Sequence, residues 1–181
     1  MNLMKFIKVF IYIAVISAVV IFLASPYFNW SLLDCINYTV TIASFLCVIY
    51  ERYAWKLFVR WTHLPVLPKI LTGEFKYENK DAKEWIRKSG TIQIKQTLLC
   101  VKIITETNEM KSVSVSANIR EENEGYILYY VYRTEPKNEF VDKNPSKLGA
   151  ARVDLSYLPN FKGKYWTTNS KGDFHFKPLN P

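Results

Sequence analysis

The segment "GKYWTTNSKGDFHF", residues 163–176, brings rings, hydroxyls and a cation close together. Asn, Ser and Gly at its centre tolerate the tight backbone of a hairpin loop, so two paired strands are predicted. Successive side chains of a strand face opposite sides, which separates Tyr165 from Trp166. Rings can stack on flat ligands, and hydroxyls and Lys171 can bind phosphate groups. The alternative interpretations are core packing of the rings and a solvated turn at Lys171.

The composition favours an anionic partner or a membrane. The chain has 181 residues and a net charge of +8, and a basic excess attracts nucleotides, nucleic acids, phosphates or lipid headgroups. The alternative is a membrane protein whose basic residues mark its inner side. The three cysteines show no CxxC spacing, and the chain has two histidines. We therefore expect no disulfide framework, no metal site and no cofactor.

Two apolar segments near the N-terminus predict a transmembrane helical hairpin. Residues 9–24, "VFIYIAVISAVVIFLA", and residues 35–50, "CINYTVTIASFLCVIY", contain no charged side chain. With their interfacial neighbours they reach the roughly 20 residues that a membrane span needs. The following "SPYFNW" lacks the small-residue cleavage site of a signal peptide. Polar residues of the second span either bond to their own helix or form a face for self-association or a water path.

The distribution of basic residues predicts the orientation of this hairpin. Lys5 and Lys8 precede the first span, and Arg52 and Lys56 follow the second, whereas the connecting loop contains neither Lys nor Arg. Because basic residues stay on the cytoplasmic side, both termini are expected in the cytoplasm, with a short loop outside.

The sequence divides into three parts. Residues 1–60 are predicted to form the transmembrane hairpin with a juxtamembrane extension. Residues 61–69 form a linker whose prolines end the helix. Residues 70–181 form a cytoplasmic domain.

Alternation of apolar and polar residues dominates the third part. In "KSVSVSANIR", residues 111–120, Val113 and Val115 share one face. Repeated alternation with intervening turn signals indicates an antiparallel sheet with one solvated face. About eight strands in this length most simply close into an up-and-down, lipocalin-like β-barrel. One short helix is expected at Asp81–Lys88. The side chains expected inside the barrel are Gly73, Phe75, Tyr77, Val101, Ile103, Val113, Val115, Val153, Leu155, Tyr165, Phe174 and Phe176.

Several motifs resemble one known family. Two N-terminal spans, the linker "LPVLP", the strand "GEFKYE" and the closing "FKGKYWTTNSKGDFHFK" are similar to the two-transmembrane, β-strand-rich membrane effectors of bacterial CBASS antiphage operons, also described as SMODS-associating effectors. The resemblance covers nearly the whole chain.

The resemblance implies a sequence of events. A partner nucleotidyltransferase makes a cyclic dinucleotide or another cyclic oligonucleotide, and the β-barrel binds it. The protein then forms a homo-oligomer, and its helices disrupt the lipid of the inner membrane, so the infected cell dies. The residues expected to bind the ligand are Tyr77, Tyr165, Thr167, Asn169, Lys171 and Arg133.

Two other functions are considered. A membrane-anchored, lipocalin-like carrier of a lipid or other apolar ligand is the main alternative, and an all-apolar cavity would favour it. An enzyme is not expected, because the sequence shows no convincing acid pair, no Gly-rich phosphate loop and no nucleophile motif. A DNA or RNA polymer is not an expected partner.

Overall fold

The computed structural model describes residues 3–59, 64–78, 85–122, 125–140, 146–168 and 170–179. The chain forms two compact units. One unit contains residues 65–96 and 100–181, and the other contains residues 2–64 with residues 97–99.

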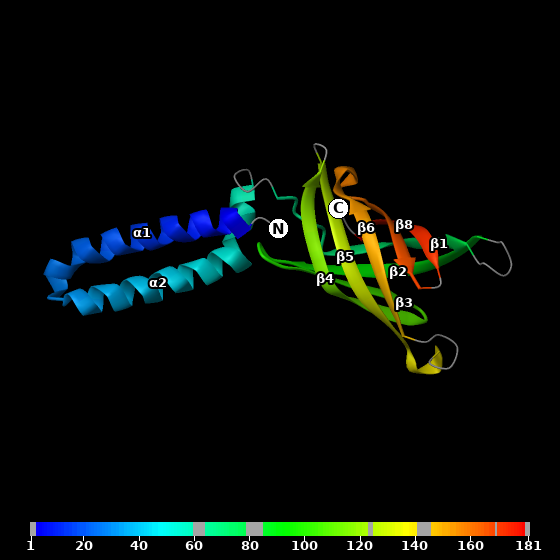
Figure 1. Cartoon of the computed structure of the whole chain (residues 1–181), viewed down its shortest axis with the longest axis horizontal. Coiled ribbons are helices and arrows are strands. Elements are labelled where there is room, and N and C mark those ends of the chain that lie inside the picture. Colours follow the sequence, from blue (N-terminus) through cyan, green and yellow to red (C-terminus); the bar gives the residue numbers. More distant parts are fainter. Residues whose placement is uncertain are drawn as a thin grey trace. The chain divides into compact units, whose positions relative to one another are not determined.

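The helical unit contains two long apolar helices, α1 (Leu3–Phe28) and α2 (Leu32–Arg52), followed by a short 3-10 helix, η1 (Ala54–Phe58) (Figure 1). Residues 6–28 and 32–52 are long and apolar enough to cross a membrane. At 1.5 Å per residue, each is long enough for a hydrocarbon core of about 30 Å. The two predicted spans are therefore present as candidate membrane helices.

Local hydrogen bonds define how α2 begins and how it holds its polar side chains. Ser31 caps the helix, since its hydroxyl accepts from the backbone N–H of Asp34 and its own N–H donates to the Asp34 carboxylate at 3.0 Å. The hydroxyls of Thr39 and Thr41 donate to the carbonyl oxygens four residues earlier, at 2.7 and 2.8 Å. Both threonines thus bond to their own helix, the first of the two predicted alternatives.

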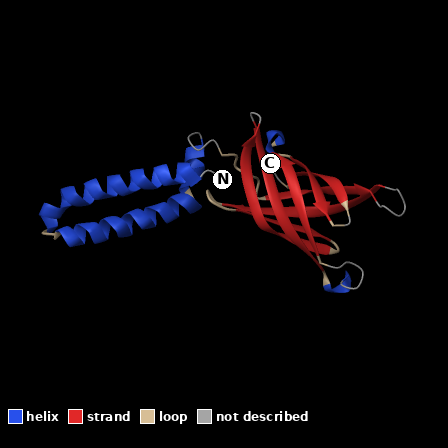
Figure 2. Ribbon diagram, viewed as in Figure 1, coloured by secondary structure: helices blue, strands red, loops and turns tan. Residues whose placement is uncertain are grey.

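Among the described residues, eight antiparallel strands close into a β-barrel (Figures 1 and 2). Consecutive strands pair along the chain, and the last strand pairs with the first. This arrangement confirms the predicted up-and-down barrel. The strands are β1 (Ile70–Glu78), β2 (Trp85–Gln96), β3 (Val101–Thr107), β4 (Met110–Glu122), β5 (Gly125–Pro136), β6 (Lys147–Asp154), β7 (Phe161–Thr167) and β8 (Lys171–Pro178), with short 3-10 helices η2 (Asn138–Phe140) and η3 (Leu155–Tyr157).

The middle of the barrel is filled by apolar side chains from most of its strands. Leu71, Leu128, Val153 and Phe176 are completely buried. The ring of Phe75 lies 4.9 Å from that of Phe176, in an edge-to-face arrangement. Such burial drives closure of the sheet, because apolar area removed from water stabilises the fold by roughly 25 cal/mol per Å².

A β-bulge in β4 changes which side chains face inward. The register with β5 shifts between Ser114 and Ser116. Val115 is 70% exposed and Val113 pairs with the exposed Arg133, so the predicted place of both valines inside the barrel is wrong. An extra residue reverses the alternation of a strand. Before the bulge Ser112 faces inward and bonds to the buried hydroxyl of Thr134 at 2.8 Å.

The helix predicted at Asp81–Lys88 is also wrong for the part of this segment that the structure describes. Trp85–Lys88 belong to β2, and Lys88 pairs with Phe75 of β1. Residues 81–84 lie outside the described residues. The helical composition of this segment is overridden by the strand ladder, which satisfies its backbone groups and buries its alternate side chains.

Candidate ligand-binding site at the barrel mouth

One end of the barrel, called the mouth, is formed where odd-numbered strands end and even-numbered strands begin. Its central contact comes from three neighbouring strands. Gly172 of β8 pairs with Tyr77 of β1 on one side and with Tyr165 of β7 on the other. The two tyrosines therefore flank a residue with no side chain. The inward-facing groups of the mouth include Tyr77, Lys88, Thr107, Glu109, Tyr132, Tyr165 and Thr167.

Two glycines make room for the rings at the mouth. A Cβ at Gly172 would lie 2.9 Å from the ring and hydroxyl of Tyr165, and a Cβ at Gly149 would overlap the ring of Tyr132. Such approaches are closer than carbon atoms tolerate, so larger residues would displace the rings. The absence of side chains at these positions allows the tyrosines to lie across the neighbouring strands.

The hydroxyls of Tyr132 and Tyr165 remain protonated at neutral pH because their pKa values are raised. Burial raises the pKa of Tyr132 to about 12. Burial, followed by the proximity of Tyr132 and Tyr77, raises the pKa of Tyr165 further above its ordinary value. Protonated phenols are neutral hydrogen-bond donors. The mouth therefore offers donors to an anion as well as aromatic faces.

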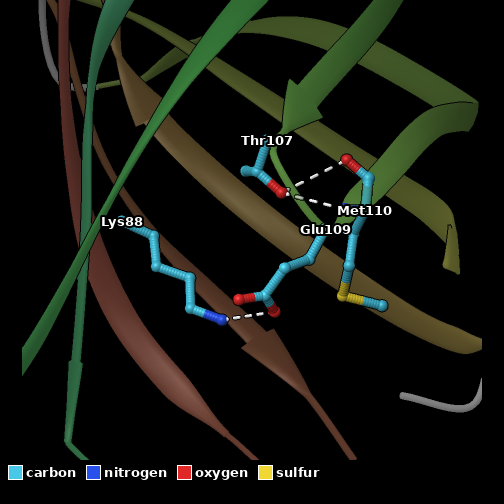
Figure 3. A network of polar contacts seen from close by, with 4 residues as sticks. All are labelled: Lys88, Thr107, Glu109 and Met110. Carbon is cyan, nitrogen blue, oxygen red and sulfur yellow. Dashed lines mark hydrogen bonds and ion pairs between the residues drawn. The ribbon is translucent and has the colours of Figure 1, made fainter. Parts of the chain in front are cut away.

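A half-buried ion pair links β2 to the β3–β4 turn at the mouth (Figure 3). The Lys88 ammonium lies 2.6 Å from a carboxylate oxygen of Glu109 and 5.9 Å from the ring centre of Tyr77. Burial lowers the pKa of Lys88, but the hydrogen bond to Glu109, the nearby Tyr77 phenol and the charge of Glu109 together raise it above its ordinary value. Lys88 is therefore a cation at neutral pH, already matched by an internal anion.

The structure brings Tyr77, Tyr165 and Thr167, three of the predicted ligand-binding residues, to the same end of the barrel. Thr167 closes the β7–β8 turn, where its hydroxyl accepts from the N–H of Ser170 at 3.0 Å and contacts the Ser170 hydroxyl at 2.8 Å. Asn169, also predicted to bind ligand, lies outside the described residues.

Two predicted ligand-binding residues lie on the outer surface. Arg133 forms an ion pair with Glu135 at 3.3 Å, and both side chains are mostly exposed. Lys171 is exposed and pairs in register with Trp166, whose ring also faces outward. The strand alternation separates these cations from the inward-facing tyrosines.

Four mouth residues were missed by the sequence analysis, namely Lys88, Thr107, Glu109 and Tyr132. Lys88 was assigned to a helix, although Ile86, Lys88 and Gly90 continue the alternation of the strand that follows. Glu109 lies in the β3–β4 turn, 21 residues from Lys88 along the chain, so the contact between them could not be predicted from sequence proximity.

The outer surface carries a separate groove of about 510 Å³ over β1, β2, β6, β7 and β8. Its lining mixes cations with carboxylates, and some of the charges already pair, as Arg87 does with Glu74 at 3.8 Å. No group of three His, Cys, Asp or Glu side chains able to hold a metal ion occurs in the described ranges. The groove is lined by Glu74, Lys76, Arg87, Arg152, Asp154, Tyr157, Lys162, Gly163, Lys164, Asp173, Phe174 and His175.

The closed barrel belongs to a defined class of receptor domains. Residues 69–177 match the cyclic dinucleotide receptor domain of Cap15, and the chain belongs to this family. It is also similar to CD-NTase-associated protein 15 of Staphylococcus schleiferi, with 38% identity over 152 residues. The match covers 81% of this chain and 80% of that protein. The resemblance to the CBASS effector family is thereby confirmed.

Proposed function

We propose that this protein is a ligand-gated membrane effector of an antiphage system and that its barrel binds a cyclic dinucleotide at the mouth. The observation that carries the proposal is the pair of inward-facing tyrosines, Tyr77 and Tyr165, beside the cation of Lys88. Membership of the Cap15 family supports the ligand class. This class supports a ligand-binding role over a catalytic one.

The chemistry of the mouth suits both parts of such a ligand. A nucleobase stacked on Tyr77 or Tyr165 gains roughly 1–3 kcal/mol. The phenol hydroxyls and the Lys88 ammonium are donors that can bind the phosphodiester oxygens, and charge-assisted bonds are the stronger of these. The alternative of an apolar carrier is less favoured, because rings such as Phe75 and Phe176 pack against one another in the middle of the barrel.

We further propose that the two helices span the inner membrane and that both termini are cytoplasmic. The lysines in the first turns of α1, the arginine at the end of α2 and the loop without Lys or Arg support this orientation. Ligand binding would then drive oligomerisation, and the assembled helices would disrupt the bilayer. Since a closed barrel has no free strand edge, association would use side chains of its outer surface or of the helices.

The test uses the full-length protein in liposomes that contain a fluorescent dye. A cyclic dinucleotide of the correct type should bind to the protein, and the liposomes should then release their dye. Measurements of the protein's particle size should show a larger assembly. A chain lacking residues 1–60 should bind the same ligand and release no dye. Dye release that does not depend on ligand, or toxicity of the truncated chain in cells, would contradict the proposal.

A further inference from the structure

The ion pair of Lys88 and Glu109 lies beside the Tyr77 ring of the proposed ligand site. Its two charged side chains are 35% and 29% exposed, so both are reachable from the mouth although neither is freely solvated. A surface ion pair adds little stability, and partial burial carries a desolvation cost. A pair of this kind beside two aromatic platforms therefore suggests a role in binding.

We propose that Lys88 is the phosphate-binding cation of the mouth and that the Glu109 carboxylate occupies the phosphate's place in the free barrel. The inference rests on the proposed function and assigns roles to two residues of the same site. Ligand binding then exchanges one anion for another at the Lys88 ammonium.

The exchange follows from the chemistry of the two anions. A carboxylate and a phosphodiester both accept hydrogen bonds from an ammonium group, and lysine offers three donors. A phosphate bound at the same distance as Glu109, 2.6 Å, would bring two negative charges together, and like charges so close repel strongly in a partly buried place. The carboxylate must therefore rotate away when the phosphate binds.

The surrounding bonds permit this rotation without unfolding of the turn. The Thr107 hydroxyl accepts from the N–H of Met110 at 3.1 Å and lies 3.2 Å from its carbonyl oxygen (Figure 3). The N–H of Lys137 donates to the carbonyl oxygen of Glu109 at 2.9 Å. The backbone of Glu109 is thus anchored on both sides, and the exchange moves its side chain while the turn stays in place.

The exchange also provides specificity. A ligand without an anionic group at this position cannot replace the carboxylate and would leave the Lys88–Glu109 pair closed. An apolar ligand of similar size is therefore disfavoured, because it would have to cover a charged pair without offering a new partner.

The test measures calorimetric binding of 3′,3′-linked cyclic dinucleotides with different bases to the full-length protein in nanodiscs. Glu109→Gln frees the Lys88 ammonium and should bind about threefold to tenfold more tightly. Lys88→Met should bind about tenfold to a hundredfold more weakly, and Lys88→Arg should bind within a few-fold of the parent. The matched control is Glu106→Gln, which removes a carboxylate paired with Lys137 at 2.9 Å on the exposed outer surface and should leave the affinity unchanged.

Thermal unfolding separates this role from a structural one. Without ligand, Glu109→Gln should melt at or below the parental temperature because it loses an ion pair, so affinity and stability should move in opposite directions. In the Lys88→Met background, Glu109→Gln should lose most of its gain in affinity. Weaker or unchanged binding by Glu109→Gln, or parental binding by Lys88→Met, would overturn the inference. If no cyclic dinucleotide bound the parent protein, the proposed function itself would be wrong.

Discussion

Removal of the Tyr165 ring tests whether the mouth holds the ligand. Tyr165 is half-buried and packs edge-to-face on Phe75, with ring centres 5.8 Å apart. Loss of a fully buried aromatic side chain costs about 3–5 kcal/mol, so Tyr165→Ala should lower the free energy of unfolding by roughly half of that, about 2 kcal/mol. Loss of a stacked base should cost a further roughly 1–3 kcal/mol in binding, a weakening of about tenfold to a hundredfold.

The assay compares ligand affinity and thermal unfolding for variants of the full-length protein. Tyr165→Phe keeps the ring and removes one donor, so its affinity should fall by about threefold to tenfold. The matched control is Trp166→Ala, which removes the next ring of the same strand from the outer surface and should leave affinity near the parental value. Lys171→Ala should also bind like the parent, because its exposed side chain lies on that outer surface.

The refuting result is specific. If Tyr165→Ala remained folded at the assay temperature and bound cyclic dinucleotide as tightly as the parent, the Tyr165 ring would contribute to core packing and not to ligand binding. A larger loss of affinity for Trp166→Ala than for Tyr165→Phe would instead place the ligand on the outer surface.

Three further predictions concern topology, domain independence and alkaline pH. In a Cys100→Ser background, a cysteine at Asn29 should react with a membrane-impermeant reagent added to intact cells, and one at Lys137 should not; the reverse pattern would refute a cytoplasmic barrel. The fragment 70–181 should fold alone, be soluble and give a cooperative melt by circular dichroism, whereas aggregation without a melt would show that it needs the helices. Because burial raises the pKa of Tyr132 to about 12, the protonated phenol stabilises the folded state below pH 10 and this stability declines as the pH rises from about 10 to 12. Tyrosinate absorbance in that range should therefore rise with unfolding, and full ionisation of the tyrosines in a folded barrel would contradict the burial.

The helical hairpin and the closed sheet can be predicted from the amino-acid sequence. The two charge-free runs predict the helices α1 and α2, because a long apolar segment has few other places to lie than a bilayer. The period-two alternation predicts the strands, and their number and short connections predict a closed sheet. Tyr77 and Tyr165 could be expected to meet because closure places the first strand beside the last, as the pairing of both with Gly172 shows.

Other features depend on contacts between distant parts of the chain. The bulge at Ser114–Ser116 turns Val115 outward, and alternation along β4 alone does not reveal it because the register is determined by pairing with β5. Lys88 belongs to a segment of helical composition that becomes strand only through its ladder with β1. Its partner Glu109 follows β3 in a turn, and the antiparallel pairing of β2 with β3, which sets Gly90 opposite Thr107, brings ammonium and carboxylate to 2.6 Å. The sequence alone thus determined most of the helices and strands, whereas strand pairing decided that residues 85–88 are strand and which charges share the mouth.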